Sequence, residues 1–242
     1  MQVLIHKDYE TLSAYDAGKI VSFVKAKPNA TLCFASGDTP IGTYRRLARQ
    51  QHEGHVDFRG CHFIGLDEWV GMDEHDAGSC GFFVRRDLFG PLGIAPQNIH
   101  AFNAKATDLP AECHRMDGLI RKLGGIDLLL VGMGINGHIA LNEPGTPFDL
   151  YSHVADLAES TVESAQKHFP QPTPMAQGIT LGLQHVQESR EMLLMASGQP
   201  KAAAMRQALQ GELTEQLPAS IIRRHANAWV LLDEAAAAEL TL

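Results

Sequence analysis

Short apolar runs alternate with segments of helical periodicity along this chain. The runs at 30–35, 61–66, 126–131, 191–196 and 228–232 predict strands, most of them apolar enough to be buried on both faces. Amphipathic spacing predicts helices that begin near Pro40, Asp108 and Pro200, and a short helix after the last strand. This alternation predicts β-α-β units, and therefore an α/β fold whose mostly parallel sheet carries helices on both faces.

The sequence contains no feature that marks a boundary between domains. It has no internal repeat, no low-complexity segment and no linker rich in Pro, Gly or Ser. We therefore expect one domain over residues 1–242.

Composition and charge exclude several classes of function. The chain has 20 Lys and Arg residues against 28 Asp and Glu, a net charge of −8, so we expect no basic surface for nucleic acid. A small anion can still bind where cations gather locally. No run of 18 apolar residues is present, and the polar start (His6, Lys7, Asp8) does not resemble a signal peptide, so we expect a cytoplasmic protein without a membrane partner. The four cysteines form no C-x-x-C pair, which predicts neither a zinc site nor a redox pair.

Ligands of parallel sheets bind beyond the carboxyl ends of the strands, and three segments there are unusual. The first is Ser36-Gly37-Asp38-Thr39-Pro40, a turn with Thr39 as the predicted N-cap and Pro40 as the first helical residue. Backbone N–H groups and two hydroxyls at a helix start favour an anion site, although an ordinary capped turn has the same pattern. The segment is not a P-loop, since G-x-x-x-x-G-K-[ST] is absent.

The second segment is the acidic pair Asp67-Glu68, at the end of the predicted strand 61–66. Successive strand residues point to opposite sides, so at most one of these carboxylates is expected to face a pocket. A solvated loop is the alternative interpretation of such a pair.

The third segment, 132–145, begins with a match to G-x-G-x-x-G. We do not interpret it as a dinucleotide site, because that motif must open a long helix and Pro144 follows too soon. A glycine-rich turn that presents Asn136, His138 and Glu143 explains the residues better. A histidine beside a carboxylate suits proton transfer near neutral pH.

Lys201 lies in the first turn of a predicted helix, where a cation opposes the helix dipole. This position indicates a nearby anion, and a solvated surface lysine is the alternative interpretation. An anion site, a carboxylate and a His–carboxylate pair together suit proton transfer on a small phosphorylated molecule. The residues alone therefore predict a reaction of the sugar-phosphate isomerase type, in which the phosphate supplies binding energy away from the reacting carbons.

These segments also carry a resemblance to a known family. Ser36–Pro40, Leu66-Asp67-Glu68-Trp69-Val70-Gly71 and the stretch N-G-H-I-A-L-N-E-P-G at 136–145 resemble the glucosamine-6-phosphate deaminase (isomerase) family, in order and over nearly the whole chain. The resemblance implies a Rossmann-like three-layer α/β/α fold. It also implies conversion of an amino-sugar phosphate to a ketose phosphate plus ammonia, with no redox cofactor and no catalytic metal.

The resemblance further implies roles for individual residues. Asp67 would shuttle the proton between C2 and C1, and His138 would open the sugar ring with Glu143 orienting it. Asn136 occupies a position where many members have Asp, and it keeps the hydrogen-bonding geometry without the charge. The implied phosphate-binding residues are Ser36, Gly37, Thr39, Lys201 and Lys167, the last in place of an arginine.

The segment 157–174 would form a mobile lid. Ser152-His153-Val154-Ala155 and the end at Leu242 resemble the shorter, unregulated members, which predicts no amino-sugar activator. Monomers and homo-oligomers both remain open.

The substrate epimer also remains open. Together with Ser152-His153-Val154, the segment Gly78-Ser79-Cys80-Gly81-Phe82 resembles the galactosamine-6-phosphate branch more closely. The two sugars differ only at C4. Two alternatives to a deaminase are a 6-phosphogluconolactonase, which lacks the N-E-P-G carboxylate, and a non-enzymatic sugar-phosphate sensor, which has no need of Asp67, His138 and Glu143 together.

Overall fold

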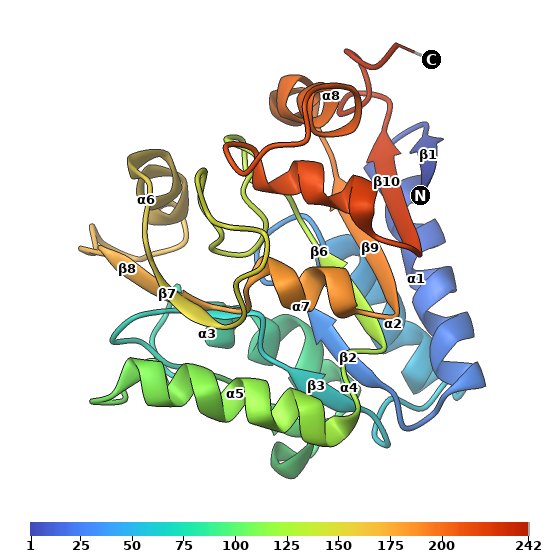
Figure 1. The fold of residues 1–242 in the computed structure, drawn as a ribbon. Coiled ribbons are helices and arrows are strands. Elements are labelled where there is room, and N and C mark those ends of the chain that lie inside the picture. The colour runs from blue at the N-terminus through green and yellow to red at the C-terminus, as the bar shows by residue number, and fades with distance from the viewer. Residues whose placement is uncertain (242) are drawn as a thin grey trace.

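A seven-stranded sheet forms the centre of the molecule, and every strand pair in it is parallel (Figure 1). The structure, a computed structural model, describes residues 1–241. The strand order is β1-β10-β9-β6-β2-β3-β5. These strands are β1 (Gln2–His6), β2 (Thr31–Phe34), β3 (His62–Ile64), β5 (Ile99–His100), β6 (Leu128–Val131), β9 (Glu191–Ala196) and β10 (Ala228–Asp233).

Helices cover both faces of this sheet (Figure 1). The helices of the molecule are α1 (Tyr9–Ala26), α2 (Ile41–His52), α3 (Cys80–Val84), α4 (Gly90–Leu92), α5 (Leu109–Leu123), α6 (Glu159–Gln166), α7 (Leu183–Glu188) and α8 (Ala202–Gln210), of which α6 lies beside β7 and β8 and not on the central sheet. Short 3-10 segments occur at Pro96–Asn98, Gln199–Lys201 and Pro218–Arg224, and Arg85–Phe89 is a π-helical turn.

Alternate residues of the central strands fill two separate apolar cores. In β2, Cys33 belongs to the core beneath α5, α7 and α8, whereas Leu32 and Phe34 belong to the core beneath α1 and α2. Because successive side chains point to opposite faces, a strand with a helix layer on each side must be apolar throughout. The predicted three-layer α/β/α fold with a parallel sheet is thereby confirmed.

A second, smaller sheet of three antiparallel strands stands beside the first and was not predicted. It has the order β4-β8-β7, with β4 at Asp67–Trp69, β7 at His153–Asp156 and β8 at Gln177–Thr180. The predicted strand 61–66 is therefore wrong at its end, because β3 stops at Ile64 and the chain crosses to β4. At Gly65 an added Cβ would lie 3.0 Å from the Cα of Ala101, so this crossing passes close to the neighbouring backbone.

Two further element predictions are corrected by the structure. The short helix predicted after the last strand is wrong, since residues 234–239 form turns, and the Asp233 side chain accepts a hydrogen bond from the Ala236 N–H. Thr39 is not a helix cap: Pro40 is the N-cap of α2, and no side chain caps this helix. The helices predicted from Asp108 and Pro200 correspond to α5 and α8, and α5 has Asp108 as its N-cap and Gly124 as its C-cap.

Among the described residues no helix is both long and apolar enough to cross a membrane.

Candidate active site

A cavity of about 470 Å³ lies beyond the carboxyl ends of β2, β6 and β9, between the central sheet and α6. It brings together seven of the nine residues singled out in the sequence, from five separate segments of the chain: Ser36, Gly37, Thr39, Asp67, His138, Lys167 and Lys201. Asn136 and Glu143 do not line this cavity, and contact His138 instead. The topology of a parallel sheet explains this convergence, because its loops meet at one edge.

The turn between β2 and α2 forms one wall of the cavity. Gly37 has φ +92°, a conformation that suits glycine, and within residues 1–241 the N–H groups of Gly37 and Thr39 have no acceptor. The Tyr9 hydroxyl fixes this turn from α1: it donates to the Thr39 carbonyl at 2.9 Å and accepts from the Gly42 N–H at 2.8 Å. The turn thus presents free backbone donors in a fixed position, as an anion site requires.

Two lysines from different elements reach the same cavity. Lys201 precedes α8 and donates from Nζ to the Met133 carbonyl at 2.7 Å. Burial, together with the charge of Lys167, lowers the pKa of Lys201. Lys167, which follows α6, pairs with Asp38 at 2.7 Å. A dianion in the cavity would therefore meet two cations.

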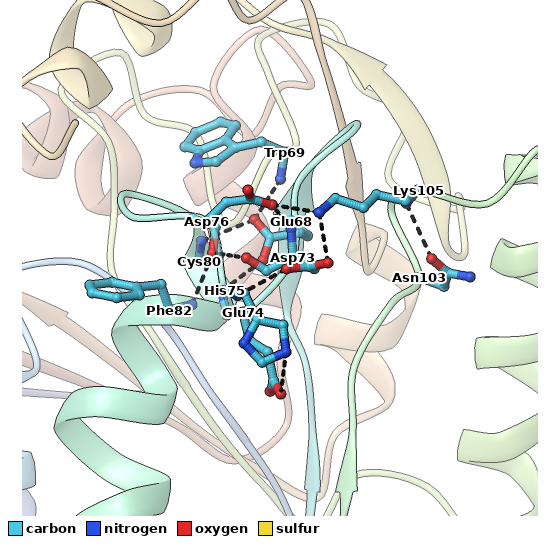
Figure 2. Close-up of polar contacts among 12 residues, drawn as sticks. Glu68, Trp69, Asp73, Glu74, His75, Asp76, Cys80, Phe82, Asn103 and Lys105 are labelled. Atoms are coloured by element: carbon cyan, nitrogen blue, oxygen red, sulfur yellow. Dashed lines mark hydrogen bonds and ion pairs between the residues drawn. The ribbon is translucent and has the colours of Figure 1, made fainter. Parts of the chain in front are cut away.

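Asp67 is the first residue of β4 and faces the cavity, whereas the side chain of Glu68 turns away from it. Burial, with a smaller contribution from the charge of Glu68, raises the pKa of Asp67 to about 7. Glu68 accepts three backbone hydrogen bonds, from Trp69 at 2.8 Å, Cys80 at 3.0 Å and Gly81 at 2.7 Å (Figure 2). As expected from strand alternation, the two adjacent carboxylates have different surroundings. Glu68 holds the start of α3, and Asp67 remains available to a ligand.

His138 lines the cavity and is the centre of a hydrogen-bonded group. Its Nδ1 lies 3.2 Å from the Thr161 hydroxyl and 3.6 Å from Oε2 of Glu143. Asn136 donates from Nδ2 to the same Glu143 oxygen at 2.9 Å, and its Oδ1 accepts from the His138 N–H at 3.1 Å. Burial raises the pKa of Glu143, but the hydrogen bonds from His138, Thr161 and Asn136 outweigh it and leave that pKa below its ordinary value. Glu143 is therefore an ionised acceptor that orients the imidazole.

The glycines of this loop make room for the imidazole. A Cβ on Gly134 would lie only 2.4–2.6 Å from the His138 ring, so only glycine fits there. The loop is closed by Asn142, which is fully buried and donates to the carbonyls of Ile139 and Leu181, each at 2.9 Å. Ala140, which lies between Ile139 and Asn142 in the chain, has φ +54°, an unusual value for alanine. The loop is thus held in one conformation around His138.

Two residues of the site were missed in the sequence. Thr161 contacts Nδ1 of His138, and Tyr9 fixes the anion-binding turn. No local pattern marks them, because each acts on a segment that is distant in the sequence. The part of the chain that the structure describes holds no group of three or more His, Cys, Asp or Glu side chains suited to a metal ion.

The family model for glucosamine-6-phosphate isomerases/6-phosphogluconolactonase matches residues 9–231. The chain belongs to this family. It is 38% identical to the glucosamine-6-phosphate deaminase of Bacillus velezensis, over 98% of this chain and 99% of that protein. The deaminase of Clostridioides difficile is 36% identical over 99% of this chain and 97% of its own. The resemblance inferred from the motifs is thereby confirmed.

Solved structures separate the two branches of the family. A structure described as a monomeric glucosamine-6-phosphate deaminase has a TM-score of 0.95 and 37% identity, and covers 99% of this chain and 100% of its own. The 6-phosphogluconolactonase of Trypanosoma brucei has a TM-score of 0.78 and 21% identity, with 99% of this chain and 98% of its own covered. At that identity the lactonase shares the fold alone.

Proposed function

We propose that this protein deaminates and isomerises a 2-amino-2-deoxyhexose 6-phosphate, giving a ketohexose 6-phosphate and ammonia. One observation carries the proposal: Asp67 and His138 face a single cavity that also holds a free anion-binding turn and two lysines. The full-length identity to proteins named as deaminases supports it.

The phosphate binds first in this scheme, because its partners are already in place. Ser36, Gly37 and Thr39 offer hydroxyl and N–H donors at the start of α2, and Lys167 and Lys201 neutralise the dianion. This binding energy, far from C1 and C2, holds the reacting carbons against Asp67.

His138 then opens the sugar ring by moving a proton from the anomeric hydroxyl to the ring oxygen. Glu143 and Thr161 orient its Nδ1 side, which leaves Nε2 for this proton transfer. Asn136 supports the same pair by bridging the Glu143 carboxylate and the His138 backbone.

Asp67 removes the proton from C2 and returns it to C1, so that the C2–N bond becomes an imine. Water adds to the imine, and ammonia leaves as the ketone forms. A carboxylate whose pKa is about 7 suits both halves of this transfer, because a base and its conjugate acid are then both accessible near neutral pH.

An ammonia-release assay tests the proposal with glucosamine 6-phosphate, galactosamine 6-phosphate and unphosphorylated glucosamine. We expect release from at least one phosphorylated epimer and little from the unphosphorylated sugar. The more active epimer identifies the preferred substrate. Gly78 and Cys80, from the segment that resembles the galactosamine branch, line the cavity in which the two epimers would be distinguished. Hydrolysis of 6-phosphogluconolactone without any ammonia release would contradict the proposed deaminase function and assign a lactonase function instead.

A further inference from the structure

A carboxylate occupies the turn that is predicted to bind phosphate. Asp38 lies between Gly37 and Thr39, lines the cavity, and keeps 57% of its side chain exposed. A negative charge at this point repels a phosphate dianion, so the binding of phosphate alone does not explain it. Its role must come from what it contacts.

Asp38 contacts one of the two cavity lysines. Its Oδ2 lies 2.7 Å from Nζ of Lys167, although the two residues are 129 positions apart in the chain. Lys201 has a different partner, the carbonyl of Met133, and within residues 1–241 it makes no ion pair. Asp38 therefore neutralises one phosphate-binding cation and leaves the other unchanged.

The surroundings of Asp38 keep it charged. Burial raises its pKa, but the hydrogen bond and charge of Lys167, with the charges of His168 and Arg86, outweigh burial and leave the pKa below its ordinary value. Asp38 is thus an anion at neutral pH, as the substrate's phosphate is.

The chain beside each partner of the pair is held by a further contact. The Tyr9 hydroxyl lies 3.3 Å from the Asp38 carbonyl and 2.9 Å from that of Thr39. On the other side, the ring of His168 packs edge-on against Phe83, with centroids 4.9 Å apart. The ion pair thus connects the turn after β2 to the segment after α6.

We propose that Asp38 competes with the substrate's phosphate for Lys167 and so sets how tightly the cavity holds phosphate. Lys167 exchanges the Asp38 carboxylate for the phosphate when substrate binds, and returns to Asp38 when product leaves. Asp38 thus adjusts phosphate affinity, and it acts through Lys167. The inference rests on the proposed function, since it takes Lys167 as a phosphate ligand.

Two readouts test the competition in Asp38→Asn. We expect the dissociation constant of inorganic phosphate, measured by calorimetry, and the KM for the amino-sugar phosphate to fall by about two- to fivefold, the range of an exposed ion pair. The effect should fade as salt rises to about 1 M, where charges are screened beyond roughly 3 Å. Asp57→Asn is the matched control, because Asp57 is also exposed and paired, with Arg59 at 2.8 Å, but lies outside the cavity.

Lys167→Gln shows whether the effect passes through Lys167. In that background Asp38→Asn should change phosphate affinity little, because the cation that Asp38 contacts is gone and Lys201 has a different partner. Unchanged or weaker phosphate binding in Asp38→Asn would overturn the inference, and so would an equal gain with and without Lys167. Phosphate binding needs no turnover, so a wild-type protein that binds phosphate as expected but releases no ammonia contradicts only the proposed function.

Discussion

Asp67 and Glu68 are consecutive residues, yet their carboxyl groups have separate partners. Asp67 faces the cavity, and Glu68, with only 5% of its surface exposed, accepts three backbone N–H groups around the start of α3. The same strand therefore places one carboxylate in the cavity and uses the other to hold the wall beside it.

Asp67→Asn should abolish proton exchange at C2 while phosphate binding persists. A positioned base contributes about 10²–10⁴-fold to rate, so kcat should fall by about that factor. Exchange is followed by NMR in deuterated water, and retained exchange would remove Asp67 from the role of base.

The pH dependence of the wild-type reaction should also reflect Asp67. Its pKa is raised to about 7 and the base must be ionised, so kcat/KM should decline as pH falls through 7. A rate that stays constant down to pH 5 would contradict this assignment.

Glu68→Ala should lower the free energy of unfolding. Three buried N–H groups would lose their acceptor, at about 1 kcal/mol or more each, so we expect a loss of about 3 kcal/mol in urea unfolding. Glu74→Ala is the control: Glu74 is more exposed and pairs with Arg85, and such pairs contribute about 0–1 kcal/mol. Equal losses in the two variants would show that Glu68 has no special structural role.

Gly134→Ala should impair catalysis by displacing the imidazole of His138. The new Cβ would lie within 2.6 Å of the ring, and a shift of about 1 Å at a reacting group can reduce the rate about 10²-fold. Gly118→Ala in α5, where a Cβ meets nothing within 4 Å, should leave kcat unchanged. Activity near the wild-type level in Gly134→Ala would mean that His138 tolerates the displacement or is dispensable.

Asp16 should make the stability of the fold depend on pH. It is fully buried between α1 and α2, its Oδ2 accepts from the Thr43 hydroxyl at 2.9 Å, and burial raises its pKa to about 7. The folded state therefore binds a proton that the unfolded state releases above pH 3.8, so stability should decrease as pH rises from about 4 to 7. The decrease is on the order of 4 kcal/mol, since one pKa unit corresponds to about 1.4 kcal/mol.

Asp16→Asn separates this contribution from that of Asp67, whose raised pKa acts in the same direction. The variant keeps an acceptor for Thr43 without the titration, so its unfolding free energy should vary less between pH 4 and pH 7 than that of the wild type. Parallel pH profiles for the two proteins would contradict the assignment.

The sequence by itself determined the parallel sheet and the three segments beyond its strands that meet at the cavity. Buried strands such as β6 and β9 need apolar residues on both faces, and turns such as those at Gly37 and Gly134 need glycine, so both leave local patterns. For the same reason strand alternation predicted correctly that only one of Asp67 and Glu68 faces the cavity.

Only the tertiary structure decided which distant segments meet around those turns. The exposed β1, the small β4-β8-β7 sheet, Thr161 beside His138 and the pairing of Asp38 with Lys167 all depend on contacts between residues far apart in the chain. Hydrogen bonds, ion pairs and raised pKa values depend on distances and burial in three dimensions, and a linear pattern of residue types does not contain them.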